Sequence, residues 1–260
     1  MSGVQIASTR FWITGASGGI GAELAAELQR RGGRIAISAR RREALDEVSQ
    51  GRMHIEPVDI TDRAAVHTAV EAVRTALGGI DVAILNAGTW QQVKIDQFDA
   101  EAFRTQFDTN LMGTVHCIEA LLPTMLADKR GVIAGMASVA GYRGLPGSEA
   151  YGASKAALIN LLESLRGSLG PRGIRVQTIS PGFVKTDLTA RNKFPMPFLI
   201  DAKTAASSIA DGIVAEKTEI VFPLPMMLMM KAARLVPNAL WPKLFARTPM
   251  ARGPSSQRNG

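Results

Sequence analysis

The chain has 260 residues, of which 46% are hydrophobic, so it can bury one sizeable core. Cys117 is the only cysteine, which excludes an intrachain disulfide and fits a reducing compartment. No signal peptide is visible, and the longest apolar run, 220–230, contains two prolines and is far shorter than the roughly 20 residues of a membrane-spanning helix. We therefore expect a cytoplasmic protein.

The net charge of +7 is concentrated near the C-terminus. Residues 224–260 contain no Asp or Glu and six basic residues, so they carry +6 of this charge: Lys231, Arg234, Lys243, Arg247, Arg252 and Arg258. A nucleic-acid-binding protein would combine a basic patch with a recognisable reading motif. The sequence shows no such motif, and we expect no nucleic-acid partner.

Short apolar runs alternate with helical patterns from residue 10 to about residue 223. In chain order the patterns predict a strand at 10–14, a helix at 20–30, a strand at 34–39, a helix at 43–49, a strand at 53–57, a helix at 63–77, a strand at 81–85, a helix at 100–126, a strand at 132–137, a helix at 151–169, a strand at 174–179, a helix at 204–215 and a strand at 219–222.

Strands separated by helices favour parallel pairing through right-handed crossovers, with helices on both faces of the sheet. The sequence therefore predicts an α/β fold with a doubly wound, parallel, seven-stranded, Rossmann-like sheet in a three-layer α/β/α arrangement. We expect one cofactor-binding and catalytic domain at 1–223, a basic, Met-rich helical extension at 224–250, and a flexible tail at 251–260.

A glycine-rich turn, Thr14–Gly21, follows the first predicted strand and opens the first predicted helix. Gly15, Gly19 and Gly21 allow a tight bend and a close approach to a pyrophosphate, which the free N–H groups of the helix would bind. An ordinary turn before a helix is the alternative, but the position between strand and helix favours a dinucleotide site.

The second predicted strand ends without the carboxylate that usually binds the ribose 2′-hydroxyl of NAD. Arg40, Arg41 and Arg42 stand there instead. A guanidinium pairs well with a phosphate, so we expect NADP(H) in preference to NAD(H), with Ser17 adding a hydrogen bond. The alternative is that the arginines begin a solvated helix.

Tyr151 and Lys155 are four residues apart, which places them on one face of a helix, and Ser138 lies thirteen residues before Tyr151. A neighbouring ammonium favours a phenolate, so we expect Lys155 to lower the pKa of Tyr151 towards the range of a general acid or base. The three histidines and Cys117 show no metal-ligand spacing, and we expect no metal.

With these motifs, and with Asn86-Ala87-Gly88, Asn110 and Pro181-Gly182 in order, the chain resembles the short-chain dehydrogenase/reductase family over about residues 8–223. The resemblance implies a single sheet of strand order 3-2-1-4-5-6-7. It also implies a catalytic set made of Asn110, Ser138, Tyr151 and Lys155, in which Asn110 holds a water in a proton relay.

The resemblance further implies cofactor contacts along the whole chain, two of which, Tyr151 and Lys155, belong to the catalytic set as well. The cofactor-binding residues are Gly15, Ser17, Gly19, Ile20, Gly21, Arg40, Asp59, Ile60, Asn86, Ala87, Gly88, Tyr151, Lys155, Pro181, Gly182, Val184 and Thr186. Within this set, Asp59 and Ile60 are expected at the adenine, and the segment from Pro181 to Thr186 at the nicotinamide amide.

These observations predict a carbonyl reductase or alcohol dehydrogenase that transfers a hydride between NADP(H) and a carbonyl or secondary alcohol. The alternative is a non-catalytic NADP(H)-binding protein that engages a membrane or a partner through its basic tail. Substrate contacts are expected from Trp90, from 142–147 and from the insert 183–203. Because residues 194–200 of this insert are strongly apolar, a lipophilic substrate is favoured.

The segment 224–247 combines basic residues with Met226, Met227, Met229 and Met230. Four interpretations stay open: a helix packed on the core, a peripheral contact with an anionic membrane, a lid over the substrate pocket, or a subunit contact. The resemblance also favours a homodimer or homotetramer formed through the helices predicted at 100–126 and 151–169.

Overall fold

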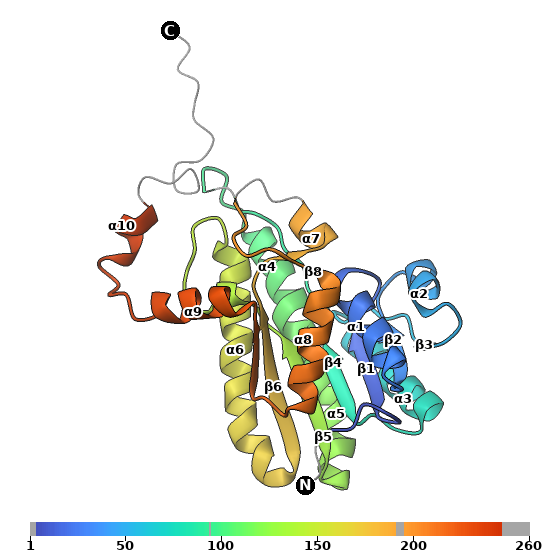
Figure 1. Cartoon of the computed structure of the whole chain (residues 1–260). Coiled ribbons are helices and arrows are strands. Elements are labelled where there is room, and N and C mark those ends of the chain that lie inside the picture. Colours follow the sequence, from blue (N-terminus) through green and yellow to red (C-terminus); the bar gives the residue numbers. More distant parts are fainter. Residues whose placement is uncertain (1–3, 94, 191–194, 246–260) are drawn as a thin grey trace.

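The computed structural model describes residues 4–93, 95–190 and 195–245. Its centre is a parallel seven-stranded sheet in the order β3-β2-β1-β4-β5-β6-β9 (Figure 1). The strands are β1 (Arg10–Thr14), β2 (Arg34–Ser38), β3 (His54–Ile55), β4 (Val82–Leu85), β5 (Gly131–Met136), β6 (Ile174–Pro181) and β9 (Glu219–Phe222). The predicted fold class and strand order are confirmed, and the order reverses between β1 and β4, where such sheets bind ligands.

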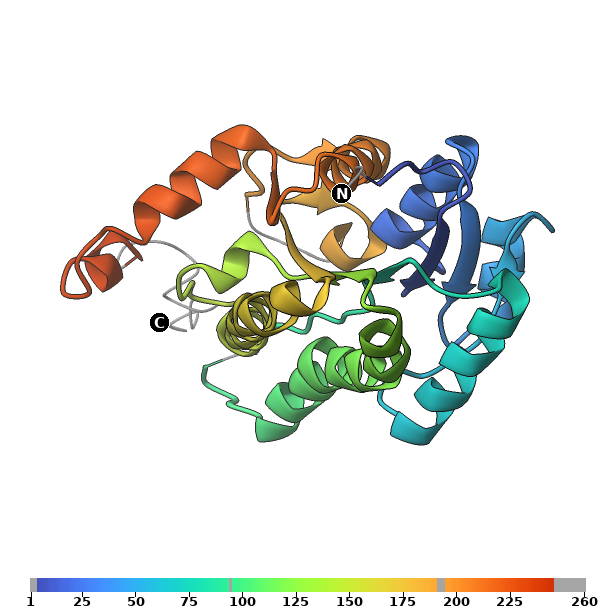
Figure 2. The ribbon, with the colours of Figure 1, turned by 90° about the horizontal axis from the view of Figure 1, so that it is seen from below.

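Helices cover both faces of this sheet (Figure 2). One face carries α1 (Gly19–Arg30), α2 (Arg42–Ser49) and α8 (Ala202–Val214), and the other carries α3 (Arg63–Leu77), α4 (Ala100–Phe107), α5 (Gly113–Asp128) and α6 (Glu149–Leu169). The central strands are apolar on both sides: in β1, Phe11 faces the first layer and Trp12 the second, and both are fully buried. This explains why the strands read as continuous apolar runs.

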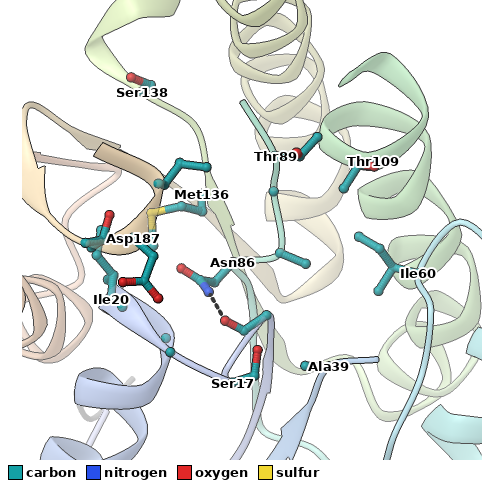
Figure 3. A pocket seen from close by; sticks show the side chains of 18 of the residues that line it. Ser17, Ile20, Ala39, Ile60, Asn86, Thr89, Thr109, Met136, Ser138 and Asp187 are labelled. Atoms are coloured by element: carbon teal, nitrogen blue, oxygen red, sulfur yellow. Dashed lines mark hydrogen bonds between the residues drawn. The ribbon is translucent and has the colours of Figure 1, made fainter. Parts of the chain in front are cut away.

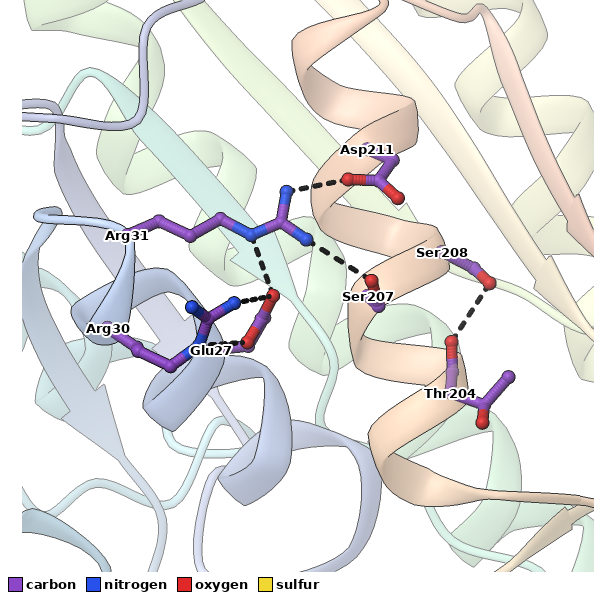
Figure 4. Close-up of polar contacts among 7 residues, drawn as sticks. All are labelled: Glu27, Arg30, Arg31, Thr204, Ser207, Ser208 and Asp211. Atoms are coloured by element: carbon purple, nitrogen blue, oxygen red, sulfur yellow. Dashed lines mark hydrogen bonds and ion pairs between the residues drawn. The ribbon is translucent and has the colours of Figure 1, made fainter.

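Polar contacts join α1 to α8 at the edge of the first layer (Figure 4). Arg31 lies 2.6 Å from Asp211 and 2.7 Å from Glu27, and it donates a hydrogen bond to Ser207. Since these groups are partly exposed, each ion pair contributes at most about 1 kcal/mol. The apolar contacts beneath them carry most of the attachment.

The structure differs from the prediction in three places. The third strand is reduced from 53–57 to His54–Ile55. The helix predicted at 100–126 is interrupted by a π-helical turn, Asp108–Met112, in which the side chain of Asn110 bonds to Thr89 and Ser154. The insert 183–203 contains a two-stranded sheet of β7 (Val184–Lys185) and β8 (Ile200–Asp201), with α7 (Asp187–Ala190) between them. Strands of two residues are too short to show periodicity.

The C-terminal extension is helical, as expected, but it forms two pieces: α9 (Leu224–Ala233) and α10 (Trp241–Phe245). They extend from β9 away from the body of the molecule (Figures 1 and 2). Residues 246–250 of the predicted extension and the predicted tail 251–260 lie outside the described residues. In the described part of the chain, no helix combines the length and the apolar character needed to cross a membrane.

Candidate active site

A cavity of about 670 Å³ opens where β1, β4, β5 and β6 end (Figure 3). All the predicted cofactor-binding residues line it: Gly15, Ser17, Gly19, Ile20, Gly21, Arg40, Asp59, Ile60, Asn86, Ala87, Gly88, Tyr151, Lys155, Pro181, Gly182, Val184 and Thr186. Ser138 lines it as well, whereas Asn110 does not. The structure thus brings segments from the whole domain to one place.

The glycine-rich turn is bonded tightly to the end of β4. Asn86 Nδ2 donates to the carbonyl oxygens of Thr14 and Gly15 at 3.0 and 2.9 Å, and the backbone N–H groups of Asn86 and Ala87 donate to Thr14 Oγ1. Gly15 has φ +66°, and a Cβ there would lie 2.5 Å from Ala87 Cα. Only glycine fits this position, and the turn is thereby fixed against the floor of the cavity.

Helix α1 begins at Gly19 and points its N-terminus into the cavity. The residue before it, Gly18, caps no N–H group through a side chain, so the first N–H groups remain available to an anion. A Cβ on Gly19 would lie 3.1 Å from Thr186 Cγ2, which shows how closely the segment after β6 covers the turn. The arrangement suits a pyrophosphate between the two segments.

The end of β2 supplies a positively charged rim. Arg40 and Arg41 are exposed and line the cavity next to Ser38 and Ala39. Among the residues that the structure describes, no ion pair neutralises either arginine. Two free guanidinium groups at a cavity rim are well placed for a phosphate.

Asp59 and Ile60, which follow β3, also line the cavity. The Asp59 side chain accepts hydrogen bonds from the backbone N–H and the hydroxyl of Thr61, at 3.0 and 2.8 Å. These bonds hold the carboxylate in one orientation at the cavity wall.

Ser138 follows β5 and begins a short 3-10 turn, Val139–Gly141, in which its Oγ accepts the N–H of Ala140 at 3.1 Å. This turn packs directly on α6. A Cβ on Gly141 would lie 2.8 Å from the backbone nitrogen of Ala156, and one on Gly152 would lie 3.1 Å from the carbonyl oxygen of Ala140. These two glycines therefore set how closely Ser138 approaches the helix that carries the tyrosine.

Tyr151 and Lys155 share one face of α6, as predicted, with Lys155 Nζ 5.7 Å from the centre of the tyrosine ring. The expected effect on the pKa of Tyr151 is not found. Burial raises the pKa of Tyr151 above its usual value, and a hydrogen bond from Ser138 opposes this only in part. Lys155 does not act as the expected fixed charge, because burial lowers its own pKa to about 8.

The Lys155 ammonium donates to the carbonyl oxygen of Met136 at 2.7 Å. This bond takes one of its three protons and leaves two for other partners. Burial and this bond fix the position of the amine beneath the cavity, close to Gly88, where an added Cβ would lie 3.4 Å from Nζ.

Asn110 is fully buried behind the cavity wall, and its side chain is occupied by protein groups. Oδ1 accepts the N–H of Thr89 at 2.8 Å, and Nδ2 donates to the carbonyl oxygen of Thr89 and to Ser154 Oγ, both at 3.0 Å. Ser154 in turn donates to the carbonyl oxygen of Tyr151. The side chain of Asn110 therefore connects the loop after β4 to α6.

Several residues at the cavity were not predicted, among them Thr89 and Met136. Asp187 and Thr189, which line it as well, were expected only as part of the insert 183–203. Thr189 Oγ1 donates to the carbonyl oxygen of Val184 at 2.6 Å and accepts the N–H of Thr186 at 3.0 Å, so it closes the turn that covers the cavity. A Thr-x-x-Thr spacing after the Pro-Gly pair was the available signal.

Two predicted substrate contacts lie elsewhere. Tyr142 is buried in the core and donates a 2.5 Å hydrogen bond to Glu219, because β9 lies beside the turn that carries it. Neither Tyr142 nor Trp90 lines the cavity. Of the insert 183–203, Val184, Thr186, Asp187, Leu188 and Thr189 reach it, and Phe194 lies outside the described residues.

No group of three or more His, Cys, Asp or Glu side chains suited to a metal ion occurs among the described residues. The donor set of the cavity consists instead of glycine-rich backbone, guanidinium groups, hydroxyls, a phenol and an amine. Such a set binds phosphates at one end and polarises an oxygen at the other.

The sequence of this chain is similar to those of known proteins. Residues 10–195 match the family model described as short chain dehydrogenase. An uncharacterized oxidoreductase of Myxococcus xanthus is 40% identical over 235 residues, covering 88% of this chain and 93% of that protein. One of Staphylococcus epidermidis is 33% identical over 210 residues, covering 80% and 90%.

Solved structures agree with these matches. A short chain dehydrogenase from Burkholderia cenocepacia in complex with NADP superposes with a TM-score of 0.82 and 27% identity, covering 93% of this chain and 99% of that one. A short-chain dehydrogenase from Streptomyces avermitilis shares the fold, with a TM-score of 0.80, 24% identity and coverage of 94% and 98%. This chain belongs to the short-chain dehydrogenase family, whose members bind a nicotinamide cofactor, and it is an oxidoreductase of that family.

Proposed function

We propose that this oxidoreductase reduces the carbonyl group of an apolar substrate with NADPH and catalyses the reverse oxidation of a secondary alcohol. The observation that carries the proposal is one cavity with two chemically different ends. Arg40 and Arg41 line it next to Ala39, and Ser138 lies on the side of the cavity away from Ala39 (Figure 3) and lines it together with Tyr151. The glycine-rich turn lies between them.

The residues present fit a dinucleotide. The cavity volume of about 670 Å³ is in the range of small-molecule sites. Gly15 and Gly21 let the turn pack closely on itself and on the end of β4, since an added Cβ would lie 2.5 Å from Ala87 Cα at Gly15 and 2.5 Å from the carbonyl oxygen of Gly15 at Gly21. This closely packed backbone lines the cavity without side chains at either position. The N-terminus of α1 would hold the phosphates, and the segment from Pro181 to Thr186 would hold the nicotinamide end.

The charge of the rim supports NADP(H) over NAD(H). Arg40 and Arg41 would bind the additional phosphate on the adenosine ribose, with Ser17 as a further donor from the turn. In this region the residues of β2 offer no carboxylate to a ribose hydroxyl. The neighbouring structure from Burkholderia cenocepacia holds NADP, which is consistent with the proposal.

The protein's own groups would act on the substrate oxygen, while the bound cofactor supplies or accepts the hydride at the carbon. Ser138 Oγ and Tyr151 OH would donate hydrogen bonds to the carbonyl oxygen, where negative charge develops. Because burial raises the pKa of Tyr151, the phenol is protonated near neutral pH and can give its proton to that oxygen. The alcohol product thus receives one hydride and one proton.

Lys155 is suited to restore the proton on Tyr151. Its pKa of about 8 means that the buried amine can gain and lose a proton near the working pH. Asn110 would act as a positioning residue, since its side chain holds Thr89 and Ser154 on either side of this pair. The oxidation of an alcohol requires the deprotonated phenol, so we expect it to be fastest at alkaline pH.

An apolar substrate is favoured by the segment that covers the cavity. Leu188 lines the cavity and is 40% exposed, and Phe198 and Leu199 are 48% and 42% exposed just before β8. β8 pairs with β7, whose Val184 also lines the cavity. These side chains would bury part of their surface on an aliphatic or aromatic substrate.

The reaction is tested by NADPH oxidation with ketones and aldehydes of increasing chain length. We expect kcat/KM to rise about threefold to fourfold for each added methylene group, which corresponds to ~0.8 kcal/mol of buried surface. A rate independent of chain length would contradict the apolar site. Bound NADPH with no turnover of any carbonyl compound would favour the non-catalytic alternative.

The cofactor preference is tested by Arg40→Asp, with Arg42→Asp as the matched control. Arg42 is the first residue of α2 and does not line the cavity. We expect Arg40→Asp to raise the KM for NADPH by roughly 10–100-fold, as for the loss of a charged hydrogen bond, with little change for NADH. Equal effects of the two variants on NADPH would contradict the role of Arg40.

A further inference from the structure

The two faces of α9 have opposite environments, although both are apolar. Met226, Met230 and Ala233 face the body of the protein and are at most 8% exposed. Leu224 and Leu228, one turn apart on the other side of the helix, are 61% and 58% exposed. Leucines at this exposure on an isolated helix face are costly in water when nothing covers them.

The apolar exposure continues beyond α9. Leu235, Leu240 and Leu244 are 84%, 49% and 60% exposed in the described residues that follow. We call residues 224–245 the arm. Figures 1 and 2 show its ribbon extending away from the body of the molecule.

The arm is also basic. It contains no Asp or Glu, and within the part of the chain that the structure describes no acidic group is paired with Arg234 or Lys243. Arg143, which contacts the arm from the turn before α6, has neutral partners: the carbonyl oxygen of Val236 at 3.1 Å and Asn238 Oδ1 at 2.8 Å. Lys231 alone is neutralised, by Glu219 at 2.6 Å.

The arm is fixed to the body close to the active site. Trp241 Nε1 donates to the carbonyl oxygen of Gly144 at 2.7 Å, and the guanidinium of Arg143 lies 5.2 Å from the centre of the Trp241 ring. Gly144 belongs to the segment between Ser138 and Tyr151. Met226, at the base of the arm, packs against Gly182 of the cavity wall, where an added Cβ would lie 2.7 Å away.

The arm and the entrance of the cavity face the same end of the molecule. Figure 1 shows α10 and α7 at this end, where the strands leading to the cavity finish. The exposed side chains of Leu188, Phe198 and Leu199 lie in and after α7. Two segments with exposed apolar residues therefore lie at the end of the molecule where the cavity opens: the arm, which also carries basic residues, and the segment in and after α7.

We propose that the arm docks on an anionic lipid surface, with its leucines in the interface and its basic residues at the headgroups. Exposed leucines combined with unpaired cations and no acid are the composition of an interfacial helix. A second copy of this chain is a less suitable occupant, because two arms packed on one another would bring like charges together. The proposal is independent of the proposed reaction.

The test is co-sedimentation of the full-length protein with phosphatidylcholine vesicles, with and without phosphatidylglycerol. We expect binding only to the anionic vesicles, and weaker binding as salt is added. Arg234→Gln with Lys243→Gln should lower the partition coefficient by roughly fivefold for each charge, or about 25-fold together. Leu228→Glu with Leu235→Glu should lower it by a larger factor.

Val214→Glu is the control, because Val214 is a 41% exposed apolar residue at the end of α8, outside the arm and outside the helices expected at a subunit contact. This variant should bind vesicles as the wild type does. Wild-type binding by Leu228→Glu with Leu235→Glu would overturn the proposal. So would the absence of vesicle binding together with a dimer, seen by sedimentation velocity, that the same leucine variant dissociates.

Discussion

The cavity and the arm are held in the fold in opposite ways. Around the cavity, the glycine-rich turn, β4 and α6 are joined by buried and partly buried hydrogen bonds and by glycines that admit no side chain, as at Gly15 and Gly141. The arm is joined to the body by a few partly exposed polar contacts and by one apolar face, with Met226 and Met230. Chemistry that depends on distances of a few tenths of an ångström needs the first kind of attachment, and an adaptable surface needs the second.

Among the variants that test this difference in attachment, we expect the largest effect, a loss of kcat, from Gly141→Ala. The new Cβ would lie 2.8 Å from backbone atoms of α6, so the turn carrying Ser138 must move away from Tyr151. A displacement of about 1 Å typically lowers kcat by about 100-fold, and cofactor affinity should stay unchanged.

Gly144→Ala is the matched control for this variant, because no atom lies within 4 Å of an added Cβ at Gly144. We expect its kcat to equal that of the wild type. Steady-state kinetics and NADPH fluorescence titration check both variants. A wild-type kcat for Gly141→Ala would show that the turn is not as closely constrained as we describe.

The partly buried hydrogen bonds that Thr14 Oγ1 accepts can be broken by Thr14→Val. The substitution keeps the shape of the side chain but removes the acceptor of the Ala87 N–H. It also removes one of the two acceptors of the Asn86 N–H, which donates to the carbonyl oxygen of Ile84 at 3.1 Å as well. We expect a loss of about 1–3 kcal/mol in the free energy of unfolding, measured by chemical denaturation. Thr68→Val, at an exposed position on α3, should change it by less than about 0.5 kcal/mol. Equal effects at the two positions would contradict a special role for this turn.

The buried amine of Lys155 makes stability depend on pH. Because its pKa falls from 10.5 to about 8 in the folded protein, the unfolded chain binds more protons between these two pH values. Stability should therefore rise with pH, by roughly 2 kcal/mol between about pH 7.5 and pH 9.5. The raised pKa of Tyr151 has the opposite effect only above about pH 10.

The contribution of Lys155 is isolated by comparing the wild type with Lys155→Met at both pH values. The increase in the free energy of unfolding between these pH values should be smaller in Lys155→Met by roughly 2 kcal/mol. The same pH dependence in both proteins would mean that the amine is not buried as described.

The smallest effect on global stability is expected in the arm. Trp241→Phe removes the hydrogen bond to Gly144 but keeps the aromatic ring, and the free energy of unfolding should fall by less than about 1 kcal/mol. Local opening should increase instead, so trypsin should cleave faster after Lys231, Arg234 or Lys243. Trp90→Phe is the same substitution outside the arm, and it should leave these cleavage rates unchanged. Equally fast cleavage of the arm in Trp90→Phe would contradict the idea that the Trp241 hydrogen bond holds the arm.

The site was predictable from the sequence wherever the chemistry requires one residue type at a fixed spacing. Gly15 must be glycine because of its backbone angle, and Tyr151 and Lys155 must be one helical turn apart. The seven strands were predictable because apolar runs and helical periods alternate along the chain. Their parallel pairing then follows from general rules of connection, whereas the strand order was implied by the family resemblance.

Other features depend on tertiary contacts that leave no periodic signal. The π-helical turn contains Asn110, whose side chain bonds to Thr89 and Ser154, and both of these lie far away in sequence. The pKa of Tyr151 was predicted with the wrong sign, since the spacing shows the neighbouring amine but does not show how desolvation shifts the pKa of each group. The position of Tyr142 depends on β9, which follows it by almost eighty residues.

The most direct test of the account compares the two tyrosines of the chain, using NADPH and the best carbonyl substrate of the series. Tyr151 lines the cavity beside Ser138, whereas Tyr142 is bonded to Glu219 outside it. We expect Tyr151→Phe to lower kcat by about 10²–10⁴-fold with unchanged NADPH affinity, and Tyr142→Phe to keep the wild-type kcat. Wild-type turnover in Tyr151→Phe would contradict the assignment of this tyrosine as the proton donor, and with it the reaction that we propose.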